Sequence, residues 1–152
     1  MAHAARALSG LGLSLLAACA SPPETRFAEA AIPPGQARLY VYRTREAPGP
    51  KDAGTVTLNT HPLAVLGRGE YVSVLLPPGT ILLRAGREEA FARVSPEPIA
   101  LAADQAVYCA LSADLSASVV LWTFSCSRDP EDHAPLRTCR RGALDRTVDW
   151  VP

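Results

Sequence analysis

The chain has 152 residues, of which 48% are apolar, and its 15 basic and 15 acidic side chains leave no net charge at neutral pH. This length suits one domain with its own core, and the apolar content is typical of a folded chain. The charge balance argues against a nucleic-acid-binding protein, which needs a concentrated basic surface. For the same reason, no polybasic patch for anionic lipid headgroups is expected.

Residues 1–18 have the pattern of a signal peptide. Arg6 precedes an apolar run, 7–18, that is shorter than the ~20 residues needed to span a bilayer. The small residues Ala17-Ala18 lead directly into Cys19, and this stretch resembles the lipobox of bacterial lipoproteins. The resemblance implies cleavage before Cys19 and attachment of a diacylglycerol and further acyl chains such as palmitate, which would anchor the protein. The alternative is an ordinary secretory peptide in which the cysteine is incidental.

The lipidated Cys19 and the following residues, up to residue 36, are expected to form a tether. Two Pro-Pro pairs, at 22–23 and 33–34, would stiffen it toward polyproline geometry. No aspartate follows Cys19. By resemblance to the sorting rule of two-membrane bacteria, this implies attachment to the outer membrane, with the domain facing the periplasm.

Between residues 37 and 126, short segments rich in β-branched and aromatic residues alternate with Gly- and Pro-containing turns. Pro77-Pro78-Gly79 predicts a tight turn that joins 70–76 and 80–85 in a hairpin, and 105–111 and 118–125 predict another. The expected strands are 37–43, 54–60, 63–66, 70–76, 80–85, 91–94, 99–102, 105–111 and 118–125. This spacing favours an all-β fold, a two-layer antiparallel β-sandwich of immunoglobulin-like or prealbumin-like type.

Residues 127–152 form a tail in which the strand pattern stops. Asp129 followed by Pro130 and two acidic residues predicts the start of a short helical turn. Arginines at 137, 140 and 141, followed by Gly142, predict its end. Trp150, close to the end of the chain, is expected to pack back onto the domain or to remain exposed.

Three cysteines remain beyond Cys19, and an exported compartment would allow one disulfide among them. The preferred prediction pairs Cys126 with Cys139, which would staple the tail to the last strand and leave Cys109 buried as a small apolar residue. Pairing of Cys109 with Cys126 is the competing prediction.

An ordered set of short motifs covers roughly residues 32–126. In order, they are the run 33–43, Val56-x-Leu58-Asn59, Gly69-x-Tyr71-Val72, Leu76-x-Pro78-Gly79 and Ala103-x-Gln105-x-x-Tyr108. This set resembles a family of small bacterial lipoproteins known only as domain of unknown function 2846. The resemblance implies a compact exported β-sandwich without an assigned activity and supplies no site residues. Thr60 and Asp104 depart from it, because both stand where a turn would favour glycine.

Enzyme signatures are not evident. The two histidines beyond the signal peptide, His61 and His133, have no metal-ligand spacing and are expected at surface turns; no metal or cofactor is predicted. Candidate binding residues are Tyr40 and Tyr42, which share one face of the first strand, and Trp150. If that face were open, the two rings could stack on a sugar or a partner strand; the alternative is that they are buried.

The expected function is therefore that of a non-catalytic binding or structural domain of the cell envelope, held to the membrane by a covalent lipid. Its partner would be an envelope protein or peptidoglycan; no small-molecule ligand is indicated. One alternative is a periplasmic inhibitor of a hydrolase such as a muramidase or a protease, with the stapled tail as its protruding loop. Another is a cell-wall hydrolase, which would require two convergent carboxylates in a deep cleft.

Overall fold

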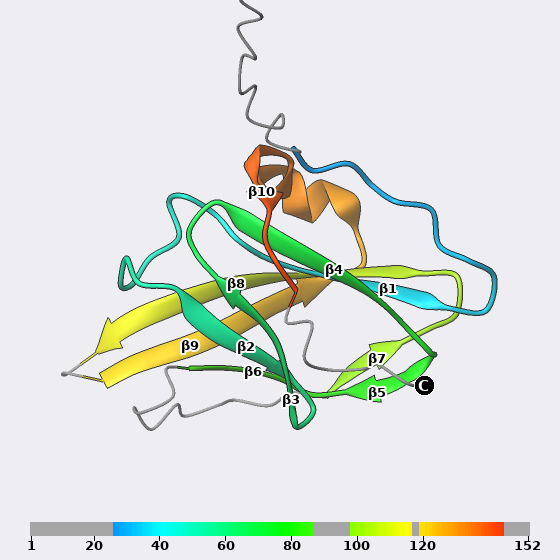
Figure 1. Ribbon diagram of the computed structural model, residues 1–152, viewed down its shortest axis with the longest axis horizontal. Helices are drawn as coiled ribbons and strands as arrows, with labels where there is room; N and C mark the ends of the chain where they lie inside the picture. The colour runs from blue at the N-terminus through cyan, green and yellow to red at the C-terminus, as the bar shows by residue number, and fades with distance from the viewer. Residues whose placement is uncertain (1–25, 87–97, 117–118, 145–152) are drawn as a thin grey trace, which may run out of the picture.

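The computed structural model describes residues 26–86, 98–116 and 119–144, which fold mainly as β-strands (Figure 1). A single 3₁₀ helix, η1 (Pro130–Thr138), lies among these residues. The strands are β1 (Ala37–Arg43), β2 (Gly54–Leu58), β3 (His61–Leu66), β4 (Glu70–Leu76), β5 (Gly79–Ile81), β6 (Leu83–Gly86), β7 (Ile99–Leu101), β8 (Ala106–Ser116), β9 (Val119–Ser127) and β10 (Arg140–Arg141). The predicted all-β fold is confirmed. The signal peptide, Cys19, the strand expected at 91–94 and Trp150 lie outside the described residues.

The largest sheet has the strand order β10-β4-β1-β8-β9. Its central strand β1 pairs antiparallel with β4 and parallel with β8, and β8 and β9 form the hairpin predicted for this part of the chain. The large sheet is therefore mixed, and the prediction of a wholly antiparallel fold is wrong, because the chain passes through the other sheets between β1 and β8 instead of joining them by a hairpin. Leu39 and Val41 of β1 belong to one buried cluster, whereas Tyr40 and Tyr42 belong to another. Because both faces of β1 are covered, its sequence is a nearly continuous apolar run instead of an alternation of apolar and polar residues.

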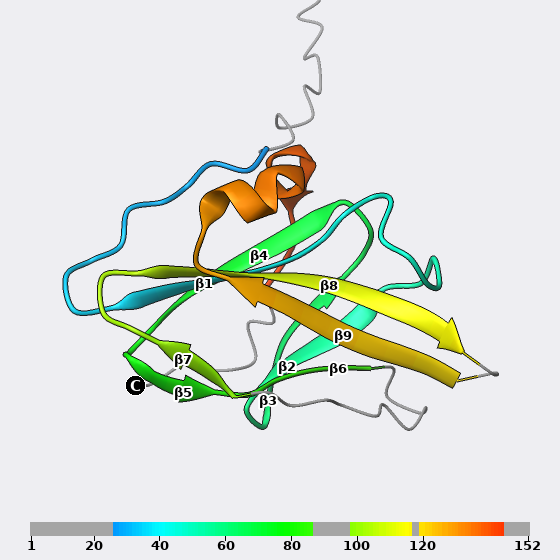
Figure 2. The same cartoon turned by 180° about the vertical axis from the view of Figure 1, so that it is seen from behind.

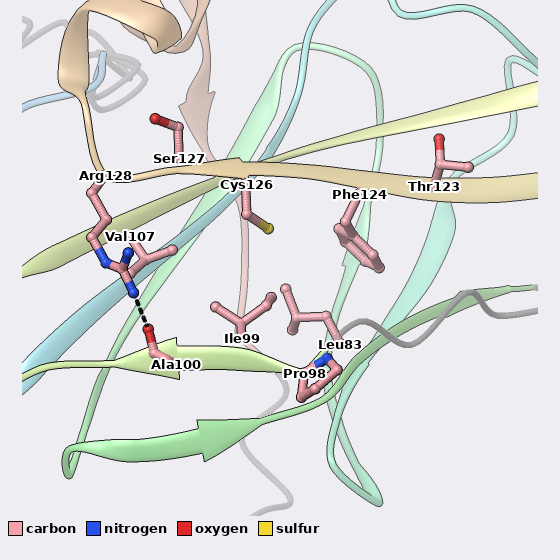
Figure 3. A pocket seen from close by; sticks show the side chains of 10 residues that line it. All are labelled: Leu83, Pro98, Ile99, Ala100, Val107, Thr123, Phe124, Cys126, Ser127 and Arg128. Carbon is pink, nitrogen blue, oxygen red and sulfur yellow. Dashed lines mark hydrogen bonds between the residues drawn. The ribbon is translucent and has the colours of Figure 1, made fainter.

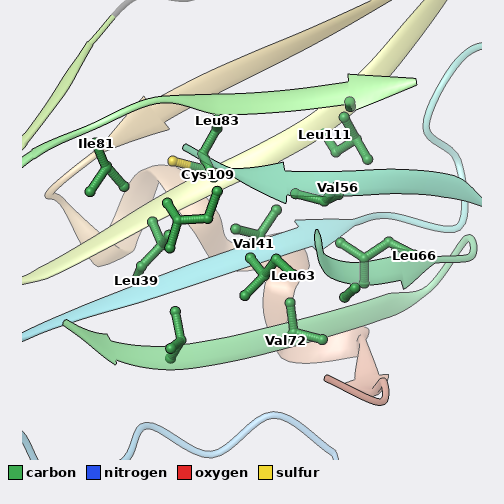
Figure 4. Close-up of a cluster of buried hydrophobic side chains, with 14 of the residues drawn as sticks. Leu39, Val41, Val56, Leu63, Leu66, Val72, Ile81, Leu83, Cys109 and Leu111 are labelled. Carbon is green, nitrogen blue, oxygen red and sulfur yellow. The ribbon is translucent and has the colours of Figure 1, made fainter. Parts of the chain in front are cut away.

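Two smaller sheets, β3-β2-β6 and β5-β7, face one side of the large sheet, as the opposite views in Figures 1 and 2 show. The space between them is filled by aliphatic side chains from all three sheets (Figure 4). Val41 comes from β1, Val56 from β2 and Ile81 from β5, and each is at most 6% exposed. Period-2 alternation in β2 places Val56 and Leu58 in this core and leaves the threonines between them half-buried.

At the two turns where glycine was expected, near Thr60 and at Asp104, the chain has residues that tolerate a left-handed backbone. Asn59, at the β2–β3 turn, has a φ of 55°, and Asp104, before β8, has a φ of 61°. The Asp104 carboxylate also accepts a hydrogen bond of 2.8 Å from the N–H of Gly35. Thr60 is accommodated because Asn59, not Thr60, takes the positive φ.

The hairpin predicted around Pro77-Pro78-Gly79 is wrong. β4 pairs with β1 and β10, while β5 pairs with β7 and β6 pairs with β2. The chain therefore leaves the large sheet after Leu76 and enters the opposite layer. Two consecutive prolines offer no N–H groups for a ladder, so they suit a passage between layers as well as a tight turn.

The start of the predicted helical turn is confirmed, and so is the position of Arg137 in its last turn, but the rest of the predicted end is not. Asp129 is the N-cap, and its carboxylate accepts a hydrogen bond of 2.9 Å from the N–H of Glu131. The helix ends at Thr138, and Cys139 is already extended. Arg140 and its neighbour, predicted to end the helix, instead form β10, parallel to β4. Pro135 inside η1 removes a helical N–H, which is consistent with 3₁₀ geometry instead of a longer α-helix.

The preferred disulfide prediction, Cys126 with Cys139, is also wrong. Cys109 and Cys126 are directly opposite each other in the β8–β9 ladder, with 4.1 Å between their Cα atoms, and they form the disulfide. Cys139 is free and buried on the other face of the large sheet. Since Cys109 belongs to the core between the layers, the large sheet separates it from Cys139. The tail is therefore not stapled by a disulfide.

Candidate functional site

The outer face of the large sheet, which points away from the two smaller sheets, gathers all four tyrosines of the chain. Tyr40 and Tyr42 are two positions apart on β1, so they share a face. Tyr108 of β8 is the register partner of Tyr40, and Tyr71 of β4 is that of Tyr42. None of the four is more than 5% exposed. We call this group the tyrosine cluster.

The segment that enters the domain from the N-terminus covers part of this cluster. The ring of Phe27 meets those of Tyr40 and Tyr71 edge to face, with 5.3 Å between centroids in both cases. The N–H of Ala30 donates a 3.0 Å hydrogen bond to the Tyr40 hydroxyl, and the Tyr108 hydroxyl donates one to the Glu29 carboxylate. The start of the described chain is therefore attached to the domain, although residues up to 36 were predicted to be tether.

Helix η1 covers the rest of the cluster with Leu136 and His133. Tyr40 and Tyr42 are therefore buried, and the prediction that they form an open binding face is wrong. The alternative, that both rings are buried, is confirmed. Strand alternation correctly placed the two rings on one face, but it could not show that the N-terminal segment and the C-terminal helix lie over that face.

His133 is buried instead of lying at a surface turn as predicted, and it is only 5% exposed. Its Nδ1 lies 2.6 Å from the Tyr42 hydroxyl, and its ring stacks on Tyr108 with centroids 5.3 Å apart. Burial lowers the pKa of His133 from its ordinary value, although the charges of Asp132 and Asp129 oppose this shift. The imidazole is thus held in its neutral form, and its Nε2 has no hydrogen-bond partner among the described residues.

A pocket of about 320 Å³ lies beside His133, between the N-terminal segment and η1. Its lining residues are Phe27, Glu29, Tyr108, Pro130, His133, Leu136 and Arg137. The aromatic rings offer stacking surface, while the carboxylate of Glu29 is engaged by Tyr108. In chemical terms, the pocket places aromatic surface beside a buried imidazole, and the Nε2 of that imidazole is itself buried.

Cys139 is the one free cysteine among the described residues, and it lies at the edge of the tyrosine cluster. Burial raises the pKa of its thiol to about 11, with a further contribution from the charge of Glu46. The Sγ donates weak hydrogen bonds to the backbone carbonyls of Arg43 and Pro135. A thiol in this state is protonated at neutral pH and is a poor nucleophile, because thiolate is the reactive form.

A second opening, of about 450 Å³, lies between β9 and β7 at the side of the core (Figure 3). It is lined by Leu83, Pro98, Ile99, Ala100, Val107, Thr123, Phe124, Cys126, Ser127 and Arg128. The Arg128 guanidinium spans the opening and donates a 2.9 Å hydrogen bond to the Ala100 carbonyl. Residues 87–97, which connect β6 to β7, lie outside the described chain, so we assign no ligand to this opening.

Arg43 is a structural residue that the sequence reasoning missed. It is fully buried, donates hydrogen bonds to the carbonyls of Pro50 and Asp52, and lies 5.0 Å from the ring of Trp122. The guanidinium therefore ties the loop after β1 to the core. Alternation along β1, which places position 43 on the same face as Val41, was the available signal for its burial.

The described residues contain no group of three or more His, Cys, Asp or Glu side chains placed to hold a metal ion. Their helical structure also lacks the length and apolar character of a membrane-spanning helix. No family model, curated protein or solved structure matches this chain.

Proposed function

We propose that this chain is a lipoprotein of the outer membrane, anchored through acylated Cys19, whose periplasm-facing β-domain acts by binding an envelope protein or peptidoglycan. The lipobox-like stretch before Cys19 supports the anchor. The five-stranded sheet facing two smaller sheets supports a sandwich of immunoglobulin-like or prealbumin-like type. The motif order that resembles domain of unknown function 2846 is consistent with the same proposal.

The observation that carries the proposal is the attachment of the N-terminal segment to the tyrosine cluster. Phe27 is wedged between two tyrosine rings, and its N–H donates a hydrogen bond of 3.2 Å to the Cys139 carbonyl. The contacts between the N-terminal segment and the domain thus include a residue only eight positions after Cys19. Such contacts suit an anchored domain, because a force applied at the anchor is then transmitted directly to the large sheet.

Binding is favoured over catalysis by the state of the reactive side chains. The Cys139 thiol is buried with a raised pKa, and His133 is buried, neutral and hydrogen-bonded to Tyr42. Among the described residues, Glu29 is the one carboxylate that lines the pocket beside His133. A further hollow, which is lined by Thr138 and Arg140 on either side of Cys139 in the chain, has Glu46 as its one carboxylate among these residues. The inhibitor alternative loses its main support, since the described part of the tail, up to residue 144, is packed against the sheet and its Cys139 is free.

Mass spectrometry of the full-length protein, produced in a two-membrane bacterium, tests the anchor. The expected N-terminal peptide begins at Cys19 and carries a diacylglyceryl group, whereas the Cys19→Ala variant carries none. An unmodified Cys19, or a mature form that begins elsewhere, would contradict the proposed anchoring.

Cross-linking in intact cells, followed by purification, tests the binding role. We expect a protein or a peptidoglycan fragment to be enriched with the wild type over the Cys19→Ala variant. Recovery of lipid alone, with both proteins shown to be folded, would contradict the binding role.

A further inference from the structure

Four arginines from distant parts of the chain meet around one hollow of about 520 Å³. Arg26 comes from the N-terminal segment, Arg45 from the loop after β1, Arg137 from η1 and Arg140 from β10. The remaining lining residues are Glu46, Pro135 and Thr138. All four arginines are exposed. We call this group the arginine patch.

The patch has an excess of positive charge although the whole chain is neutral. Among the described residues, Glu46 is the one carboxylate that lines the hollow, and Glu70 lies beside it, where its Oε1 is 2.9 Å from the Nη2 of Arg140. Within residues 26–86, 98–116 and 119–144, four guanidinium groups thus face two carboxylates. Overall composition argued against a basic surface, but composition cannot show that the fold concentrates the arginines at one place.

The patch includes the start of the described chain. Arg26 is the first described residue, and η1 and β10 lie near it, on the side of the large sheet opposite β5 and β7 (Figures 1 and 2). Arg26 is seven positions after Cys19, and seven extended residues span at most about 25 Å. If Cys19 is in the membrane, the tether therefore allows the patch to touch the headgroups.

We infer that the arginine patch docks onto anionic phospholipid headgroups of the membrane that holds Cys19, and that this contact orients the domain. The inference rests on the proposed lipid anchor. Guanidinium groups bind phosphate oxygens in a planar, two-pronged geometry, and each basic residue near an anionic bilayer raises binding roughly fivefold. Attachment through Cys19 supplies a high local concentration, so a patch that is weak by itself remains engaged.

The docked orientation has a structural consequence. The outer face of the large sheet, with η1 and the N-terminal segment, turns toward the bilayer, and β5, β6 and β7 turn toward the periplasm.

Vesicle sedimentation with the complete mature chain carrying Cys19→Ser isolates the contribution of the patch, because this chain lacks acyl groups. Vesicles of phosphatidylcholine with 30% phosphatidylglycerol are compared with vesicles of phosphatidylcholine alone. We expect binding to the anionic vesicles that falls about tenfold or more in the Arg26→Gln/Arg45→Gln/Arg137→Gln variant and weakens as salt is raised. The matched control is Arg84→Gln, which removes an exposed arginine from β6 in the opposite layer and should bind as the parent chain does.

Three outcomes would overturn the inference. They are equal binding to both vesicle types, an equal loss with Arg84→Gln, or soluble poly-glutamate binding as tight as the vesicles, which would assign the patch to acidic polypeptides. Thermal melts confirm that each variant is folded. Because Cys19 is not acylated in this assay, a negative result leaves the anchor to be judged separately by the mass of the native N-terminal peptide.

Discussion

Loss of the Cys109–Cys126 disulfide should weaken the domain by an amount that the structure allows to be calculated. The bond joins residues 17 positions apart, and a loop of about this size gives about 3 kcal/mol in the chain-entropy account. Cys126→Ser is a suitable perturbation because position 126 is exposed, so the hydroxyl stays solvated, while the remaining Cys109 thiol is buried as a small apolar side chain.

Urea unfolding, followed by tryptophan fluorescence, measures the effect. With a slope of about 2 kcal/mol per molar urea, 3 kcal/mol corresponds to a midpoint lowered by about 1.5 M. Reducing the wild type should lower the midpoint by a similar amount, whereas reductant should have no effect on Cys126→Ser. Cys139→Ala is the control, because its midpoint should still fall on reduction. If Cys139→Ala removes the effect of reductant, then Cys126 pairs with Cys139 and the reasoning from strand register is refuted.

Three further predictions concern the outer face of the large sheet. Phe27→Ala should lower the free energy of unfolding by about 1–2 kcal/mol, which is less than the loss expected for a fully buried ring. It should also speed tryptic cleavage after Arg26, which mass spectrometry measures, with Arg84→Gln as the control. The pKa of His133 in the folded protein lies below its ordinary value of 6.5, so the unfolded chain binds more protons at this residue. The urea midpoint should therefore fall as the pH drops from about 7.5 to about 5.5. His133→Phe should reduce this pH dependence, and an unchanged dependence would contradict the burial of a neutral His133. The Cys139 thiol, with a pKa of about 11, should react with a disulfide reagent at pH 8 far more slowly in the native protein than in urea; equal rates would show that it is accessible.

The strand positions could be predicted because they depend on local patterns. Val56 and Leu58 alternate with threonines, and the run around Val41 is apolar on both faces, so period and composition identified β1 and β2. Apart from the β8–β9 hairpin, strand pairing could not be predicted in the same way. Pro77-Pro78 fits a hairpin turn or a passage between layers equally well, and only the packing of β4 on β1 distinguishes them.

In the candidate site, too, local features could be predicted from the sequence, whereas features that depend on tertiary packing could not. The sequence predicted that Tyr40 and Tyr42 share a face, but their burial depends on Phe27 and on Leu136, which is 96 positions after Tyr40. Likewise, the spacing of the cysteines allowed two pairings, and the register of β8 with β9 selected one of them.

By itself, the sequence determined the all-β class, most strand positions, the helix start at Asp129 and the prediction of a lipid anchor, because these depend on neighbouring residues. The tertiary structure decided which strands pair, which cysteines are bonded, how the tyrosine cluster is covered and where the arginines of a neutral chain gather. These features bring together residues that are far apart in the chain. They are set by the burial of apolar surface and by strand register across the whole domain, which no local pattern contains.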